Sequence, residues 1–399
     1  MYAAIAALLV SLTPATAWSG SNEPLDAAAS VIRVETACST TPDCFETIAE
    51  AHAWTWTTRN PAPSASAPLL WEIGPGTWDE TWSCPSGGGH VSVRGAGRGV
   101  TIISGDPSGS PREAGTAEDC ENLDFSKLTF RSEDWGFRWK GTGSSSWKDV
   151  GIESVSGGTT SAAWAEVDCS PSPAAKPTHY FFNSRVALFD SAGGAHPAAA
   201  WLGGCSDAWF HGGQILAELR DAAVSPAMSA IRLQGDASLR VFGTSVDALA
   251  TPEAGVQAGV LMGVDAGAAG NRFEMHAGAI RARSQAAGTV HVIGVATSGG
   301  HVDTIDTAFV VEPSGAGIAT RLSQPAFASP FMWPADTAPP PLTQSVDGQD
   351  LFVEIDCASD GNCDAGGYEA HLMVMNPAEC GSADPWFDTV TGRCRNVTN

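Results

Sequence analysis

Residues 69–106 read LLWEIGPGTWDETWSCPSGGGHVSVRGAGRGVTIISGD, and this stretch decides the fold class. It contains three short runs that mix apolar and polar residues, LLWEIG (69–74), HVSVRG (90–95) and VTIISG (100–105). Alternation with a period of two is typical of β-strands, and the glycine that closes each run is typical of a tight turn. The stretch therefore predicts short strands joined by short turns.

The same rhythm continues along the chain as a repeated unit of about 30 residues. In each unit two inward residues flank one outward residue, and a third inward residue follows a small-residue turn. The predicted inward triplets are Leu123-Phe125-Phe130, Lys148-Val150-Val155, His179-Phe181-Val186, Ala208-Phe210-Ile215, Leu239-Val241-Val246, Phe273-Met275-Ile280 and Val302-Thr304-Phe309. The second triplet fits only in its last two positions, and the third fits less well than the rest. A repeat of this length indicates stacked coils, so we predict an all-β, right-handed parallel β-helix over residues 69–324.

The segments around the solenoid have their own signatures. Residues 1–17 resemble an export signal, since an apolar run precedes the small residues Ala15-Thr16-Ala17. Within residues 18–68, positions 43–58 have helical spacing and predict a capping helix with Asp43 as its N-cap. Residues 325–343 are rich in proline and predict a linker, and residues 344–399 predict a small disulfide-stapled segment that covers the solenoid end.

The order of helix, strand and glycine-rich turns over residues 43–106 resembles the opening of pectin-lyase-like β-helix proteins. It is most similar to pectinesterases, in which a capping helix precedes the first coils. That resemblance implies the fold and activity on polysaccharides. The catalytic residues of pectinesterases, polygalacturonases and pectate lyases are not found on the central coils, and Gln349-Asp350 lies beyond the linker. Function must therefore be argued from this chain's own residues.

Charge and cysteine content limit the partners and the compartment. The net charge of −23 disfavours a nucleic-acid partner, because such a surface repels phosphates. No segment is long and apolar enough to predict a membrane anchor. Ten cysteines in an exported chain indicate disulfides and a secreted or periplasmic location. Pairing in chain order would join Cys38 with Cys44, Cys84 with Cys120, Cys169 with Cys205, Cys357 with Cys363, and Cys380 with Cys394, although sequence alone does not determine the connectivity.

The repeat also predicts which side chains face the solvent on one face. The first predicted outward column is Asp124, Asp149, Tyr180, Trp209, Arg240, Glu274 and Asp303, and the second is Ser126, Gly151, Phe182, His211, Phe242, His276 and Ile305. Stacked coils lie about 4.8 Å apart, so these side chains should form one surface. The catalytic candidates are His211, Arg240, Glu274, His276 and Asp303, and the ligand-binding candidates are Tyr180 and Trp209. The alternative is a set of ordinary solvated residues.

Two further features have competing interpretations. The fourteen tryptophans could stack on sugars, but burial in the core explains most of them more simply. Residues 360–369 resemble a calcium loop, with Asp360, Asn362, Asp364 and Glu369 as candidate ligands, but the flanking helices of an EF-hand are missing. The disulfide with Cys357 explains Cys363 better than a calcium loop does, so no cofactor is required.

Three functions remain open on the sequence alone. The first is a non-catalytic secreted protein that binds a polysaccharide or surface glycan, in the manner of an adhesin. The second is a carbohydrate-active lyase, hydrolase or esterase with its site on the middle coils. The third is a structural, spike-like element of an assembly. The missing family residues favour the first.

Overall fold

The computed structural model describes most of the solenoid and the strands beyond it. The described ranges are 30–38, 43–109, 112–155, 162–167, 176–189, 196–220, 227–254, 258–268, 270–298, 300–305, 307–315, 317 and 319–323, with strands at 342–346, 349–357, 368–375, 386–388 and 393–395. The predicted export signal at residues 1–17 lies outside them.

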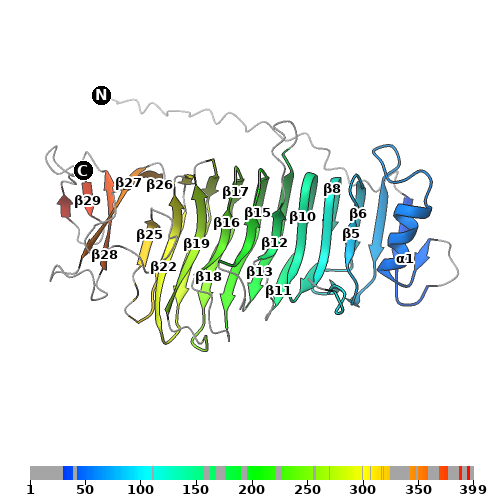
Figure 1. Cartoon of the computed structure of the whole chain (residues 1–399), viewed down its shortest axis with the longest axis horizontal. Coiled ribbons are helices and arrows are strands. Elements are labelled where there is room, and N and C mark those ends of the chain that lie inside the picture. The colour runs from blue at the N-terminus through cyan, green and yellow to red at the C-terminus, as the bar shows by residue number, and fades with distance from the viewer. Residues whose placement is uncertain are drawn as a thin grey trace, which may run out of the picture.

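The chain forms a parallel β-helix with three faces, which we call A, B and C (Figure 1). Face A stacks β1 (Ser30–Val34), β3 (Leu69–Ile73), β6 (Gly89–Gly95), the C-terminal parts of β8 (Glu113–Ser126) and β10 (Trp135–Lys148), the N-terminal parts of β13 (Thr178–Phe189) and β15 (Asp207–Leu219), β17 (Ser238–Phe242), β20 (Arg272–His276) and β23 (His301–Ile305). A coil thus begins at β1, ahead of the predicted start at residue 69.

The other two faces complete each coil. Face B stacks β4 (Gly76–Trp78), β7 (Thr101–Ile103), β9 (Thr129–Ser132), β11 (Gly151–Val155), the C-terminal parts of β13 and β15, β18 (Ser245–Ala250), β21 (Ala279–Ser284) and β24 (Ala308–Glu312). Face C stacks β5 (Trp82–Cys84), the N-terminal parts of β8 and β10, β12 (Ala162–Val167), β14 (Ala198–Leu202), β16 (Ala227–Leu233), β19 (Ala258–Ala268), β22 (Thr289–Ser298) and β25 (Ala319–Ser323).

The strand register confirms the predicted inward positions in all units except one. Leu123, Ala208, Leu239, Phe273 and Val302 occupy one inward column. The prediction for the second unit is wrong by three residues, because Ser145, Trp147 and Ile152 hold the inward positions assigned to Lys148, Val150 and Val155. The error has a simple cause: the first inward residue of this coil is a serine, which an apolar pattern does not detect.

Aromatic rings fill the core of the N-terminal coils. Trp147 is fully buried and stacks on Phe125 at 4.2 Å and on Phe181 at 5.6 Å. Phe181 in turn stacks on Phe210 at 4.1 Å. Trp139 and Trp164 are also fully buried, which confirms the core interpretation for most tryptophans of this region. Trp201 and Trp209, in contrast, are half-buried on outward positions.

The corner between faces A and B has the same geometry in successive coils. One outward residue is followed by a residue with a positive φ angle, then by an inward residue that starts face B. The residues at the positive-φ position are Lys127, Asp149, Asn183, Gly212, Gly243 and Ala277. Asparagine, aspartate and glycine tolerate this conformation best, which explains four of these six residues. The buried hydroxyls of Ser184 and Thr244 then donate to backbone carbonyls at the bend.

A short helix covers the N-terminal end of the coils (Figure 1). It comprises α1 (Ile48–Ala53) and the π-helical turn η2 (Trp54–Thr58), within the predicted range of 43–58. The predicted N-cap is wrong: β2 (Cys44–Phe45) pairs with β1, so the helix begins later and Thr47 accepts from the Glu50 N–H. Glu80, from the turn between β4 and β5, accepts from the N–H groups of Ile48 and Ala49, which ties the helix to the first coils.

Two of the predicted disulfides are confirmed. Cys38 is bonded to Cys44, and Cys84 to Cys120. Cys205 is disulfide-bonded, while its predicted partner Cys169 lies outside the described residues. The pairings predicted beyond residue 344 involve Cys357, Cys363, Cys380 and Cys394, whose side chains are not described.

The C-terminal segment contains a five-stranded antiparallel sheet. Its strands are β26 (Leu342–Val346), β27 (Gln349–Cys357), β28 (Tyr368–Met375), β29 (Trp386–Asp388) and β30 (Arg393–Arg395). Of the predicted calcium ligands, Asp360, Asn362 and Asp364 lie outside the described residues, and Glu369 pairs with Asp356 in the sheet. No helix in the described part of the chain is long and apolar enough to span a membrane.

Candidate functional site

The strand register brings the predicted site residues together on face A. Tyr180, Trp209, Arg240, Glu274 and Asp303 occupy consecutive rungs of the first outward column. The second column holds Phe182, His211, Phe242, His276 and Ile305. Asp149 and Gly151 do not belong to these columns, because the corrected register puts Ser146 and Lys148 in their places.

The second column forms a ladder of stacked rings, which we call the Phe–His ladder: Phe182, His211, Phe242 and His276. Neighbouring ring centroids are 5.2, 4.9 and 5.1 Å apart, and the ring planes are within 11° of parallel. These distances approach the spacing of β-strands, so each ring lies almost directly over the next. The inner rings therefore cover one another's faces, and only their edges point away from the solenoid.

Trp209, in the first column, is also covered on both sides. The ring of Tyr180 lies 6.2 Å away on one side, and the guanidinium carbon of Arg240 lies 4.4 Å from the ring centroid on the other. A cation over an indole face is an attractive arrangement in its own right. The faces that a sugar would need for stacking are thus occupied along the middle coils.

Charged side chains form a fixed network beside Trp209. Arg240 donates from Nη1 to Asp207 Oδ1 at 3.0 Å and from Nε to Glu274 Oε2 at 2.9 Å. Arg272 donates to the other carboxylate oxygen of Glu274. The Glu274 side chain is only 11% exposed, and both of its oxygens accept from guanidinium groups. These contacts hold the guanidinium and carboxylate groups in fixed orientations.

Protonation on face A is influenced mainly by burial. Burial lowers the pKa of His211, which favours its neutral form. Burial, with a smaller effect from Asp207, raises the pKa of Tyr180. Asp303 lies on the rung next to Glu274 and is half-buried. The middle coils of face A therefore carry stacked rings beside paired charges.

The N-terminal coils of face A have small side chains where the middle coils have rings. We call this area the serine terrace: Ser92, Asp124, Ser126 and Ser146. Asp124 accepts from Ser92 and Ser146, and burial raises its pKa to about 6. The repeat predicts the column of Asp124 correctly but not the burial of its carboxyl group. The signal in the sequence was that the neighbouring residues of this column, Ser92 and Ser146, are serines and not cations.

We expect Asp124→Asn to stabilise the protein at high pH. Because the folded-state pKa is raised above the ordinary value of 3.8, ionisation of Asp124 disfavours the folded state. This cost is absent below about pH 4 and complete above about pH 6, and we expect about 1 kcal/mol for this half-buried group. Thermal melts at pH 4 and pH 8 measure it. The variant should gain on wild type only at pH 8, and exposed Asp236→Asn should show no such difference.

The structure also reveals a polar cluster on face C that the sequence did not indicate. His196 Nδ1 lies 3.4 Å from Asp265 Oδ2, and Arg232 Nη1 donates to the His196 carbonyl at 3.0 Å. Burial and the nearby Arg232 lower the pKa of His196 to about 3, so this ring is neutral. The three residues lie on separate coils, which is why no local motif marked them. Among the described residues, no group of His, Cys, Asp or Glu could hold a metal ion.

Comparisons with known proteins do not identify a family for this chain. No protein-family model matches the sequence, and no curated protein matches it. Among solved structures, one similar chain is a pectin methylesterase from carrot, with 10% sequence identity and a TM-score of 0.41. The match covers 74% of the present chain and 88% of the carrot protein. The assignment of the fold rests on the strand register of the chain itself.

Proposed function

We propose that this protein is a secreted β-helix protein that binds a polysaccharide on face A without cleaving it. The observation that carries the proposal is the network of Asp207, Arg240, Glu274 and Arg272 beside Trp209. Sugars are recognised through hydroxyl groups that need hydrogen-bonding partners held in fixed positions. A network whose members already hold one another loses little conformational freedom on binding.

Adjacent rungs extend this network along the solenoid. Asp303 follows Glu274 in the same column, and the imidazole edges of His211 and His276 lie in the next column. A ligand with repeated units would meet hydrogen-bonding groups on several rungs. The disulfides fit an oxidising compartment outside the cytosol, which is where such ligands occur.

The same geometry argues against hydrolysis. A glycosidase needs one carboxyl that donates a proton and a second that acts as nucleophile or base. On the middle coils of face A, both oxygens of Glu274 accept hydrogen bonds from arginines, so neither is free to face a glycosidic oxygen or an attacking water. Glu274 is therefore poorly placed for either role, and Asp303 alone does not complete the pair.

A glycan-array screen with the purified protein, run beside reducing-end and unsaturated-product assays, tests the proposal. We expect binding without turnover, and Arg240→Met should weaken binding about tenfold, equivalent to about 1.4 kcal/mol. Arg283→Met is the matched control, since Arg283 is also paired with a carboxylate but lies on face B. Turnover that disappears in Glu274→Gln would establish an enzyme instead. Absence of any glycan binding would reject the proposal altogether.

A further inference from the structure

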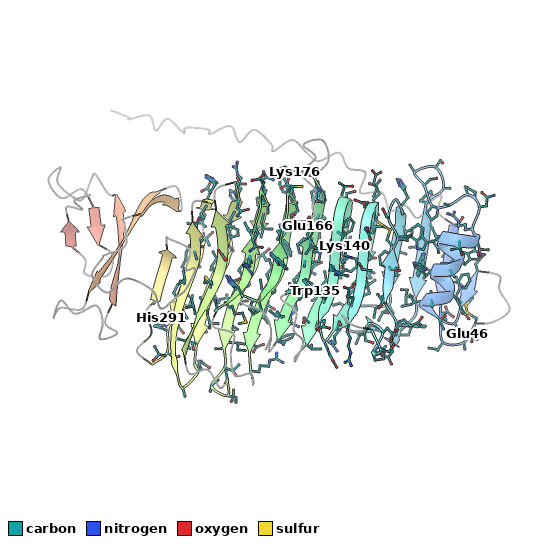
Figure 2. All side chains as sticks on the ribbon, viewed as in Figure 1. Glu46, Trp135, Lys140, Glu166, Lys176 and His291 are labelled. Carbon is teal, nitrogen blue, oxygen red and sulfur yellow. A yellow bond between two sulfur atoms is a disulfide. The ribbon has the colours of Figure 1, made fainter. Side chains whose placement is uncertain are left out.

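Face B carries balanced charges in an otherwise acidic protein. The charged residues on its described strands are four arginines and four carboxylates: Arg131, Arg185, Arg281, Arg283, Glu153, Glu218, Asp247 and Glu312. Their formal charges cancel, whereas the whole chain carries a net charge of −23. The lysines of the chain lie elsewhere, for example Lys140 on face C and Lys176 before β13 (Figure 2). Enrichment in arginine without lysine is typical of protein–protein interfaces, and a second copy would meet no net repulsion on this face.

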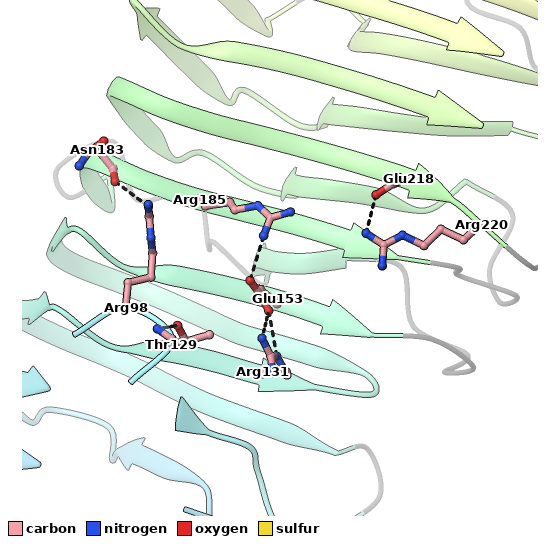
Figure 3. Close-up of polar contacts among 9 residues, drawn as sticks. Arg98, Thr129, Arg131, Glu153, Asn183, Arg185, Glu218 and Arg220 are labelled. Carbon is pink, nitrogen blue, oxygen red and sulfur yellow. Dashed lines mark hydrogen bonds and ion pairs between the residues drawn. The ribbon is translucent and has the colours of Figure 1, made fainter. Parts of the chain in front are cut away.

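The charges are distributed unevenly along face B. Toward the N-terminus, Glu153 accepts from Arg131 Nε at 2.9 Å and from Arg185 Nη1 at 3.3 Å, so one carboxylate serves two guanidinium groups (Figure 3). The Arg185 side chain is 33% exposed and that of Glu153 only 10%, so the cation lies outermost. Toward the C-terminus, Glu312 accepts from Arg283 and is still 53% exposed, more than any other charged side chain on these strands. Face B therefore presents surplus positive charge at one end and an exposed anion at the other.

The strand register places Arg185 and Glu312 symmetrically about Asp247. Asp247 is the middle outward residue of β18, and its column holds Ala187 two rungs toward the N-terminus and Val310 two rungs toward the C-terminus. Arg185 lies two residues before Ala187, and Glu312 lies two residues after Val310, so both point outward as well. A two-fold axis perpendicular to face B at Asp247 reverses both the strands and the order of the coils. It therefore brings Arg185 of each copy opposite Glu312 of the other.

Other side chains on this face are compatible with the same axis. The exposed Ala308 comes opposite the ring of Phe189, so apolar groups meet there. Asp247 lies on the axis, but it is only 2% exposed. Its carboxylate accepts from three donors of its own copy: Gln214 Nε2, Ser245 Oγ and Arg281 Nη1. The charge of Asp247 is thus balanced before a second copy approaches.

We propose that two copies of this chain associate through face B in an antiparallel arrangement about this axis. The interface is isologous, so it closes at a dimer. The overlap runs from β13 to β24 and measures about 24 Å by 17 Å, or about 400 Å² in projection. This area is at the low end for specific interfaces, so we expect a dissociation constant on the order of 10 μM. Both copies of face A stay free, so the dimer would present two glycan-binding surfaces and gain avidity for a polysaccharide, although association itself does not depend on glycan binding.

Sedimentation velocity of the full chain over a range of concentrations tests the proposal. The wild-type protein should convert from monomer to dimer as its concentration rises, and added salt should weaken the dimer. Arg185→Glu and Glu312→Arg should each weaken association at least about tenfold, because each change opposes two pairs of like charges in the dimer. An equimolar mixture of these two variants should form a heterodimer, since one of its pairs is then reversed in sign and the other is that of wild type.

Two control variants separate the interface from general effects of charge. Arg131→Glu also places a second acid beside Glu153 and changes the net charge equally, but its rung on β9 lies outside the overlap. Lys140→Glu reverses a charge on face C. Both controls should dimerise like wild type. A mixture of Arg185→Glu and Glu312→Arg that stays monomeric, or a dimer that neither change weakens, would overturn the proposed axis. A wild-type monomer at all concentrations would overturn the dimer, and binding of poly-glutamate by that monomer, lost in Arg185→Glu, would assign face B to an acidic partner protein instead.

Discussion

Gly213→Ala is expected to destabilise the solenoid by more than about 3 kcal/mol, whereas Gly212→Ala should cost only about 1 kcal/mol. The two glycines are neighbours at the corner between faces A and B, and both have positive φ angles, of 90° and 72°. A β-carbon on Gly213 would lie 2.0 Å from the carbonyl oxygen and 2.8 Å from the amide nitrogen of Ser184. Those atoms belong to the backbone of the adjacent rung, so they cannot move aside. A β-carbon on Gly212 would have nothing within 4 Å.

Urea unfolding of the two variants beside wild type measures the difference. Gly212→Ala carries the strain of a left-handed conformation without a clash, so it isolates the conformational contribution. If both variants unfold at the same urea concentration, then coil-to-coil contact at this corner is not what requires glycine.

Acidification from pH 7 to pH 5 should destabilise the protein by about 2 kcal/mol through His179 alone. This ring is completely buried in the core, and burial lowers its pKa to about 3. Trp147 Nε1 donates to Ser145 Oγ at 2.7 Å, so the Ser145 hydroxyl proton is directed to His179 Nδ1, 2.8 Å away. A folded-state pKa below the ordinary 6.5 means that the unfolded chain binds the proton more tightly. Stability is therefore complete above about pH 6.5 and declines as pH falls toward 3.

The pH dependence of the unfolding free energy, and not its absolute value, is the informative measurement. His179→Gln removes the titrating ring, so its stability should fall less between pH 7 and pH 5 than that of wild type. His301→Gln changes an exposed histidine on face A and should keep the wild-type slope. An unchanged slope in His179→Gln would show that other groups dominate the acid response.

How far the sequence predicts the fold depends on how apolar each coil is. The triplets beginning at Ala208, Leu239 and Phe273 were assigned correctly because all their inward residues are apolar. The pattern failed at Ser145, where the inward serine bonds His179 and Trp147 inside the core. His179 itself was placed inward only as a poor fit. Polar residues that satisfy one another in a core leave no hydrophobic period to detect.

The sequence predicted which residues of the candidate site are neighbours, but not which contacts their side chains make. Because side chains on stacked strands repeat by rung, the alignment placed Trp209, Arg240 and Glu274 side by side. It did not show that Arg240 would cover Trp209 and bind Asp207, since these contacts depend on side-chain rotamers. The cluster of His196, Arg232 and Asp265 was not predicted because it lies on face C, whose strands the repeat pattern did not align. The raised pKa of Asp124 results from burial of its carboxyl group, which the sequence alone does not show.

The corner between faces A and B bears on how this architecture can be lengthened or decorated. From Lys127 to Ala277, every bend described there has two residues, of which the first is left-handed and the second points inward. Between β6 and β7 the same corner holds five residues, 96–100, and β7 still pairs in register with β9. An added segment is therefore tolerated where it loops out of the coil as a whole, whereas one extra residue within a two-residue bend would shift face B out of register with face A. A whole coil, cut at equivalent bends, is the natural unit for building longer or shorter versions of the protein.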